Sequence, residues 1–233
     1  MIISDWLKSG IQPPDGVAQA YLEKRGATKE VMGRIDVGVW APPATPAPDS
    51  GFQRRCGPRG EKLSGRLVFP LYTPRGEIMG VEARSLSKDL TDYRIPHTKW
   101  APGWVTTKNC YENLWTRGRA WIVEGVFDLI ALARVVPESD VVIATLRAGM
   151  NRSQIEHLRR FCRGGVVVAY DNDEAGRRAT HGYRDGGRRR FGIVDYIERA
   201  GLHVTACRYL GKDPGDVWLT TGDRGLLKAF GGY

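Results

Sequence analysis

The sequence has no long hydrophobic run and no targeting signal. Within its 233 residues, no apolar stretch approaches the roughly 20 residues that a membrane-spanning helix needs. The amino terminus, residues 1–6, lacks the basic start and apolar core of a signal peptide. We therefore expect a cytoplasmic protein without a membrane partner.

Cysteine is scarce, and its spacing excludes two common kinds of stabilising site. The four cysteines are scattered and form no Cys-x-x-Cys pair: Cys56, Cys110, Cys162 and Cys207. This pattern supports neither a zinc ribbon nor a disulfide framework. We expect thiols that are buried or have no chemical role, and we expect no zinc.

Acidic residues are outnumbered by basic ones. The net charge is +9 and the isoelectric point is about 9.6, which favours anionic partners. Nucleic acid is the natural candidate, although proteins that never bind it can carry a similar excess.

Two stretches, residues 121–128 and 166–176, have the pattern of strand-to-helix junctions. Each begins as an apolar run of strand length, breaks on a carboxylate or glycine and continues with helical spacing. Ligands of parallel sheets bind at the carboxyl ends of the strands, so Glu124, Asp171 and Asp173 should lie together at one rim. Because clustered carboxylates repel one another unless a cation lies between them, the pattern predicts a Mg²⁺ site that handles phosphates. Capping of a helix is the simpler role for each Asp.

The surrounding pattern predicts an α/β fold with a four-stranded parallel sheet and helices on both faces. Its strands are expected at 120–124, 141–144, 166–170 and 204–209, and two of its helices at 126–136 and 153–161. An arginine-rich region then follows Asp173. Glycines interrupt this region, so one straight helix is not expected there.

The first part of the chain has a different pattern. Residues 17–22 and 28–35 predict a short helical pair. Residues 41–51 read as a weakly ordered Pro-rich linker and form the clearest boundary in the sequence. Residues 66–84 predict a β-hairpin around a Pro-Arg-Gly turn.

The motifs Glu124-Gly-x-x-Asp128 and Asp171-x-Asp173-x-Ala-Gly176 resemble those of the Toprim family, shared by bacterial-type primases, topoisomerases and some nucleases. Residues 17–220 are similar to the catalytic core of DnaG-type bacterial and phage primases. The resemblance implies a Toprim fold preceded by a smaller basic α+β subdomain. The expected division is a helical lead-in and linker (1–50), a basic subdomain (51–118), the Toprim domain (119–210) and a C-terminal tail packed on it (211–233).

The same resemblance assigns roles to acidic residues. Glu124, Asp171 and Asp173 would be catalytic and hold Mg²⁺ or Mn²⁺, with Asp128 and Asp213 as outer or second-metal ligands. Asp213 lies in a Gly-Lys-Asp-Pro segment like that of primases, but the family's second Asp in this segment is a glycine here.

The resemblance also assigns roles to basic residues. A basic surface for template and nucleotide would include Arg66, Arg84, Arg94 and Lys99. The family's Lys-Tyr pair reads Asp92-Tyr93 in this chain, which is a departure.

The resulting hypothesis is a DNA-dependent RNA primase catalytic core that joins ribonucleoside triphosphates into short primers on single-stranded DNA. A Toprim-type metal-dependent nuclease and a non-catalytic nucleic-acid-binding replication accessory protein remain alternatives. The zinc-binding and helicase-binding domains of typical bacterial primases are not found in the sequence. We therefore expect a minimal core, a fragment or a plasmid- or phage-type protein, with a replicative helicase or a separate zinc-domain protein as a possible partner.

Overall fold

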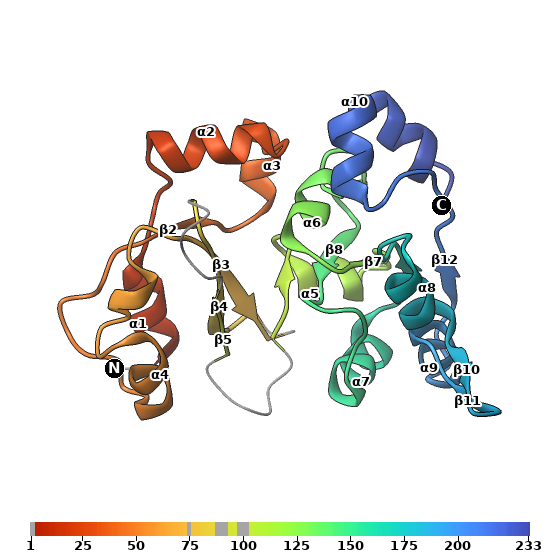
Figure 1. Ribbon diagram of the computed structural model, residues 1–233, viewed down its shortest axis with the longest axis horizontal. Helices are drawn as coiled ribbons and strands as arrows, with labels where there is room; N and C mark the ends of the chain where they lie inside the picture. The colour runs from red at the N-terminus through yellow and green to blue at the C-terminus, as the bar shows by residue number, and fades with distance from the viewer. Residues whose placement is uncertain (1–2, 74–75, 87–92, 97–102) are drawn as a thin grey trace. The chain divides into compact units, whose positions relative to one another are not determined.

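The computed structural model describes residues 3–73, 76–86, 93–96 and 103–233 and divides the chain into two compact units (Figure 1). The first unit is formed by Met1–Lys24 and Ile35–Val105, and the second by Arg25–Arg34 and Thr106–Tyr233. The division differs from the one expected from the sequence, because neither the Pro-rich segment nor the start of the C-terminal tail separates two units.

The second unit is built on a parallel sheet, as its unbroken Val and Ile runs predict. Strand β7 pairs in parallel with β8 and β9, and β9 pairs in parallel with β12. These are the four expected strands, and the short strand β6 adds an edge beside β8. In spatial order the strands are β12 (Val204–Ala206), β9 (Val166–Val168), β7 (Ala120–Val123), β8 (Val141–Ala144) and β6 (Val105–Thr106).

Helices cover both faces of this sheet. The connection from β7 to β8 crosses the sheet in one direction, and the connections from β8 to β9 and from β9 to β12 cross it in the other. Because such crossovers are right-handed, α6 lies on one face and α7, α8 and α9 lie on the opposite face. Helix α10 packs on α6, and α5 packs on α7. The helices are α5 (Cys110–Trp115), α6 (Val126–Leu132), α7 (Arg152–Phe161), α8 (Glu174–His181), α9 (Ile193–Arg199) and α10 (Pro214–Phe230).

Helix α6 ends at Leu132, earlier than the expected residue 136. Arg34, at the end of α3 (Lys29–Arg34), donates hydrogen bonds to the carbonyl oxygens of Val136 (2.8 Å) and Pro137 (3.1 Å). Both carbonyl groups lie beyond the end of the helix. Pro137, which lacks an N–H group and disfavours helical geometry in the residue before it, stands directly after the expected helix end.

The arginine-rich region forms a helix and then a β-hairpin. Helix α8 stops before Gly182, and β10 (Tyr183–Asp185) pairs antiparallel with β11 (Arg188–Arg190). Gly186 and Gly187 join the strands with φ values of 54° and 80°. Two consecutive positive φ angles are the requirement of a tight two-residue hairpin turn, and glycine adopts them without strain.

The first unit contains an antiparallel sheet with strands in sequence order. The predicted hairpin is confirmed, since β3 pairs with β4 from Leu67 opposite Arg84 to Tyr72 opposite Ile78. The strands are β1 (Ile11–Gln12), β2 (Gly38–Trp40), β3 (Leu67–Tyr72), β4 (Ile78–Arg84) and β5 (Tyr93–Pro96). The helices are α1 (Ile3–Gly10), α2 (Gly16–Lys24), α4 (Ser50–Cys56) and the 3₁₀ turn η1 (Glu61–Leu63).

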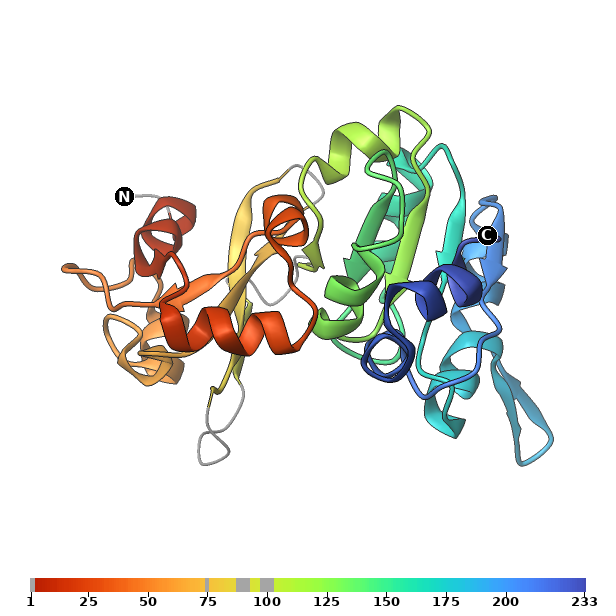
Figure 2. The ribbon, with the colours of Figure 1, turned by 90° about the horizontal axis from the view of Figure 1, so that it is seen from above.

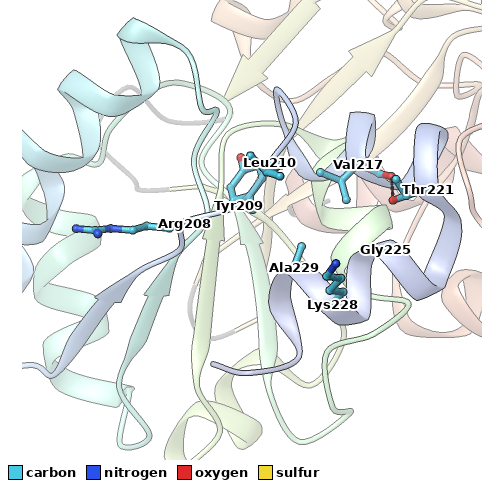
Figure 3. Close-up of a pocket in the computed structure, with 8 residues that line it drawn as sticks. All are labelled: Arg208, Tyr209, Leu210, Val217, Thr221, Gly225, Lys228 and Ala229. Carbon is cyan, nitrogen blue, oxygen red and sulfur yellow. Dashed lines mark hydrogen bonds between the residues drawn. The ribbon is translucent and has the colours of Figure 1, made fainter.

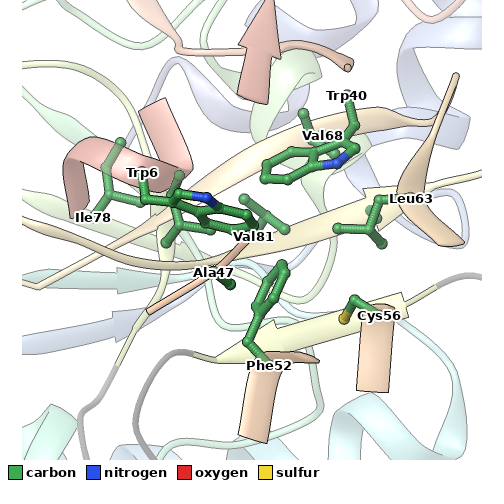
Figure 4. Close-up of a cluster of buried hydrophobic side chains, with 11 residues drawn as sticks. Trp6, Trp40, Ala47, Phe52, Cys56, Leu63, Val68, Ile78 and Val81 are labelled. Atoms are coloured by element: carbon green, nitrogen blue, oxygen red, sulfur yellow. The ribbon is translucent and has the colours of Figure 1, made fainter. Parts of the chain in front are cut away.

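Aromatic side chains fill the core of the first unit (Figure 4). The ring of Trp6 packs against Phe52 with centroids 5.0 Å apart and against Trp40 at 5.6 Å. All three side chains are almost completely buried. Edge-to-face contacts of this kind add to the stabilisation that burial of the apolar surface provides.

The expectation that residues 41–51 are weakly ordered is wrong. The N–H group of Ala47 donates to the carbonyl of Pro58 (2.8 Å), and the indole of Trp6 donates to the carbonyl of Thr45 (2.9 Å). Asp49 caps α4 through the N–H group of Phe52. The small and proline side chains let this segment lie against the aromatic core, which the local composition could not reveal.

Within the described part of the chain, no helix combines the length and the apolar character that crossing a membrane would require.

We expect Phe52→Ala to lower the free energy of unfolding of the first unit by about 3–5 kcal/mol, because it removes a buried ring from the aromatic core. Urea denaturation followed by tryptophan fluorescence measures the change. The exposed Val17 provides a control, and Val17→Ala should change stability by no more than about 0.5 kcal/mol. Equal effects of the two substitutions would contradict the assigned core.

Candidate active site

The two carboxylate motifs meet where the connections of the sheet change direction. The chain leaves β7 toward β8 on one side and leaves β9 toward β12 on the other. A crevice at the carboxyl ends of β7 and β9 is therefore the expected ligand site of this sheet. Glu124 follows β7 directly, and Asp171 follows β9 after two residues. The structure thus brings these two predicted residues to the same rim.

Hydrogen bonds between the strand ends hold this rim together. The hydroxyl of Thr145, after β8, lies 3.1 Å from the carbonyl oxygen of Val123 and 3.2 Å from the hydroxyl of Tyr170. The N–H group of Leu146 donates to the carbonyl oxygen of Glu124 at 2.8 Å. Leu146 has a φ of 62°, which is strained for a branched residue and is typical of functional loops.

Glu124 is half-buried with one oxygen left unsatisfied. Its Oε1 atom is buried and has no hydrogen-bond partner among the residues that the structure describes. Burial, followed by repulsion from Asp171, raises the pKa of this carboxyl to about 7. An unpaired carboxylate oxygen beside a second carboxylate fits a bound divalent cation, which would satisfy both.

Asp171 and Asp173 differ in their surroundings. Asp171 is half-buried, and burial together with the charge of Asp213 raises its pKa. Asp173 is exposed, and its Oδ1 atom accepts a hydrogen bond from the N–H group of Gly176 at 2.9 Å, which caps α8. Asp173 therefore does cap a helix, which is the simpler role that the sequence suggested. Capping uses one of its two carboxylate oxygens.

Gly176 allows α8 to begin directly against the Asp171 backbone. A Cβ atom at position 176 would lie only 1.9 Å from the carbonyl oxygen of Asp171. Glycine is thus required here by close packing, which explains the end of the Asp-x-Asp-x-Ala-Gly motif in physical terms.

Asp128 and Asp213 connect two helix starts. The two oxygens of Asp128 accept hydrogen bonds from the N–H groups of Gly125 and Gly215, both at 3.1 Å. Burial, followed by the charge of Asp213, raises the pKa of Asp128. Asp213 caps α10 by accepting from the N–H group of Asp216 at 2.7 Å. This arrangement ties the start of α6 to the start of α10.

A second loop brings a positive charge to the rim. Asn172 donates through its side chain to the carbonyl of Tyr209 (3.1 Å) and through its backbone to the carbonyl of Lys212 (2.6 Å). The Lys212 ammonium lies 3.7 Å from Asp213 and counteracts the rise in the pKa values of Glu124 and Asp171.

The acidic residues are close enough to influence one another, but they do not form a finished coordination cage. Throughout residues 3–73, 76–86, 93–96 and 103–233, no three Asp, Glu, His or Cys side chains are grouped so as to coordinate one ion as they stand. Joint coordination by Glu124, Asp171 and Asp173, with Asp128 and Asp213 as further ligands, stays a prediction.

The basic residues expected to contact nucleic acid belong to the first unit. Arg66 is almost fully buried, and its Nε atom donates to the carbonyl of Lys62 at 3.0 Å. The Nε atom of Arg84, at the end of β4, lies 3.2 Å from the carboxylate of Glu82. Arg94 is on β5, whereas Lys99 lies outside the described residues. Their contacts with template or nucleotide stay predictions.

Tyr209 lines a pocket of about 510 Å³ together with residues of α10 (Figure 3). Its hydroxyl donates to the carbonyl of Tyr170 at 2.7 Å, and its ring packs on Phe230 with centroids 4.8 Å apart. Sequence reasoning did not identify this residue or the other groups that position the rim, Thr145, Tyr170 and Asn172. Local signals existed for three of them, because Thr145 and Tyr170 stand at the ends of expected strands and Asn172 lies inside the Asp-x-Asp motif.

Comparison with known proteins finds similarity to DNA primases. Residues 121–207 match a family described as Toprim-like. The chain is 30% identical over 183 residues to the DNA primase of Neisseria meningitidis serogroup A, an alignment that covers 70% of this chain and 30% of that primase. The chain therefore spans less than a third of the length of this relative.

Two solved structures show the same fold over nearly the whole chain. The catalytic core of DnaG covers 99% of this chain and 78% of its own, with a TM-score of 0.64 and 23% identity. A DnaG primase catalytic domain bound to single-stranded DNA covers 99% and 77%, with a TM-score of 0.61 and 22% identity. The α/β fold with a Toprim domain and a preceding α+β unit is thereby confirmed.

The raised pKa of Glu124 predicts a pH dependence of stability in metal-free buffer. The folded protein retains the Glu124 proton up to about pH 7, whereas the unfolded chain releases it near its ordinary value of 4.5. Since the folded state binds more protons between these values, stability falls as the pH rises through this window. We expect Glu124→Gln to reduce this fall by about 1–2 kcal/mol, after allowance for partial solvent exposure.

Urea denaturation in the presence of a chelator, from about pH 5 to about pH 8, measures the effect. Glu198 on α9 is exposed, and Glu198→Gln serves as the matched control that keeps the parental slope. An identical pH slope in the parent and in Glu124→Gln would show that Glu124 is not held in a charge-repelling site.

Proposed function

We propose that this chain, which carries a Toprim domain of the DnaG primase type at residues 121–207, is the catalytic core of a DNA-dependent RNA primase. In this proposal it joins ribonucleoside triphosphates into short RNA primers on a single-stranded DNA template. The named relatives support a nucleotidyltransferase, and the primer-forming reaction is the specific form that we propose.

One observation carries the proposal. Glu124 and Asp171 follow neighbouring parallel strands at the point where the connections between strands change direction. The Oε1 atom of Glu124 is buried there without a hydrogen-bond partner among the described residues. A protein that only bound nucleic acid would gain nothing from placing mutually repelling carboxylates at such a rim. An enzyme that acts on phosphate groups would use these carboxylates to hold a divalent cation.

The residues at this rim fit a divalent cation. Glu124, Asp171 and Asp173 would hold Mg²⁺ or Mn²⁺, and Asp213 is the candidate for a further ligand, because its Oδ2 atom lies toward Lys212 rather than in the cap of α10. Bound there, the ion would neutralise charge on the phosphates and favour ionisation of the attacking hydroxyl.

The remaining groups would position these ligands and the substrate. Both oxygens of Asp128 accept backbone hydrogen bonds, so this residue would fix the start of α6 relative to the start of α10. Lys212 supplies a positive charge beside the carboxylates, where a triphosphate would lie. Asn172 holds the Lys212 loop against the Asp171 loop.

Polymerisation is favoured over hydrolysis because the similarity extends beyond the Toprim domain. The fold of the DnaG catalytic core matches 99% of this chain, including the unit that precedes the Toprim domain. A nuclease would need only the acidic rim. In the proposed primase, Arg84 and the other basic residues of the first unit would contact template and nucleotide. A replicative helicase or a separate zinc-domain protein is the proposed partner.

A priming assay tests the proposed function. The protein is incubated with single-stranded DNA, labelled ribonucleotides and Mg²⁺ or Mn²⁺, in parallel with an Asp171→Asn/Asp173→Asn variant. We expect short RNA from the parent and a loss of at least about a hundred-fold in the variant, because the variant lacks the charges that would hold the ion.

The control removes two carboxylate charges elsewhere in the second unit. Glu112 and Glu198 are exposed on α5 and α9, and Glu112→Gln/Glu198→Gln should keep the parental yield. Shortening of the DNA without ribonucleotides would show that the protein is a nuclease and not the proposed polymerase. Equal RNA synthesis by the parent and the Asp171→Asn/Asp173→Asn variant would show that the acidic rim does not take part in the reaction.

A further inference from the structure

The hairpin of β10 and β11 carries four arginines in a segment that is exposed throughout. Its strands include Arg184, Arg188, Arg189 and Arg190 against one acidic residue, Asp185. The hairpin projects from the body of the second unit, as Figure 2 shows. No core packing accounts for its composition, since every residue of both strands is exposed.

One of the three cross-strand pairs of the hairpin places like charges opposite each other. In the register of the hairpin, Arg184 faces Arg189, and Asp185 faces Arg188. Directly opposed like charges destabilise a two-stranded sheet. Arg189 is paired with Asp195 and Arg190 with Asp185 at 3.3 Å, but the described residues provide no ion pair for Arg184 or Arg188. A bound polyanion would remove this repulsion.

Aromatic rings at the base of the hairpin hold other guanidinium groups in place. The guanidinium of Arg199 lies 3.7 Å from the ring centroid of Phe191, and that of Arg189 lies 5.4 Å from it. Arg178 lies 5.2 Å from the ring centroid of Tyr183. Stacked arginines lose less side-chain freedom on binding a ligand, so the cationic surface is partly preorganised.

Helix α8 connects this surface to the acidic rim. It begins after Asp173 and ends two residues before β10, so its eight residues span about 12 Å. Arg177 and Arg178 lie exposed on this helix. A strand whose end is at the carboxylates could therefore follow α8 and reach the hairpin within a few nucleotides.

We propose that the β10–β11 hairpin binds the phosphate backbone of single-stranded DNA outside the catalytic rim. The planar guanidinium of arginine matches phosphate oxygens in two-point contacts, and positive charge without base-reading pockets gives binding that is independent of sequence. The choice of DNA as the polyanion rests on the proposed function. The binding test requires neither nucleotides nor metal. A negative result for DNA binding by the hairpin therefore leaves the proposed primase activity open, and a negative priming assay leaves the hairpin's DNA binding open.

The test compares DNA binding by the parent and by Arg184→Gln/Arg188→Gln. Fluorescence anisotropy with a labelled mixed-sequence single strand, in metal-free buffer at several salt concentrations, gives the affinity and its salt dependence. At about 50 mM salt we expect roughly ten-fold weaker binding by the variant. The slope of log affinity against log salt should decrease by about 1.4, because two phosphate contacts are lost.

Two further variants separate charge at this site from charge in general and from damage to the hairpin. Arg224→Gln/Lys228→Gln removes the same charge from exposed positions on α10, which packs on the opposite face of the sheet, and should bind DNA like the parent. Arg184→Lys/Arg188→Lys keeps the charge and should retain most of the affinity and the salt slope.

Unchanged affinity and slope in Arg184→Gln/Arg188→Gln would overturn the proposal. An equal loss of binding in Arg224→Gln/Lys228→Gln would overturn it as well, because net charge alone would then explain the effect. Vesicles containing an anionic lipid form a third arm. Hairpin-dependent binding to vesicles, with DNA binding independent of the hairpin, would assign the surface to a membrane instead.

Discussion

The mutual repulsion of carboxylates at one rim is the constraint on which the rest of the second unit depends. Folding places Glu124 and Asp171 at the ends of neighbouring strands, where burial and like charge raise the pKa values of both. Backbone N–H groups satisfy Asp128, but no described group satisfies the buried oxygen of Glu124. A cation between these groups would convert this destabilising arrangement into a binding site, and it is the simplest reason for the arrangement to exist.

The surrounding elements limit how far the repelling carboxylates can move apart. Asp128 joins the starts of α6 and α10, and Gly176 lets α8 begin in contact with the Asp171 backbone. The Thr145 hydroxyl links the ends of three strands, and Asn172 fastens the loop that carries Lys212. Each carboxylate is therefore held from a different element, which would limit the rearrangement needed to bind the proposed metal ion. The arginine hairpin would extend the same unit by a surface for the phosphate backbone that we propose it binds.

Local patterns predicted much of the fold and the positions of the acidic residues. Buried strands such as Val141–Ala144 are recognisable because parallel sheets require unbroken apolar runs, and α7 (Arg152–Phe161) begins within one residue of the helix expected from residue 153. The failures involve partners that are distant in sequence. Residues 41–51 are ordered by an aromatic core that their own composition does not show, and Arg34 contacts the carbonyl groups after α6 from about a hundred residues away. Local reading also could not distinguish a broken helix from the short hairpin formed around Gly186 and Gly187.

Anomalous diffraction from crystals of the protein prepared in Mn²⁺ tests the central claim most directly, because it locates the ion without relying on activity. The account predicts a manganese peak at the rim, about 2.1 Å from carboxylate oxygens of Glu124 and Asp171. The peak should be absent from crystals of Asp171→Asn/Asp173→Asn prepared in the same way. Manganese bound elsewhere, with Glu124 and Asp171 left without it, would contradict the assignment of this rim as the metal centre.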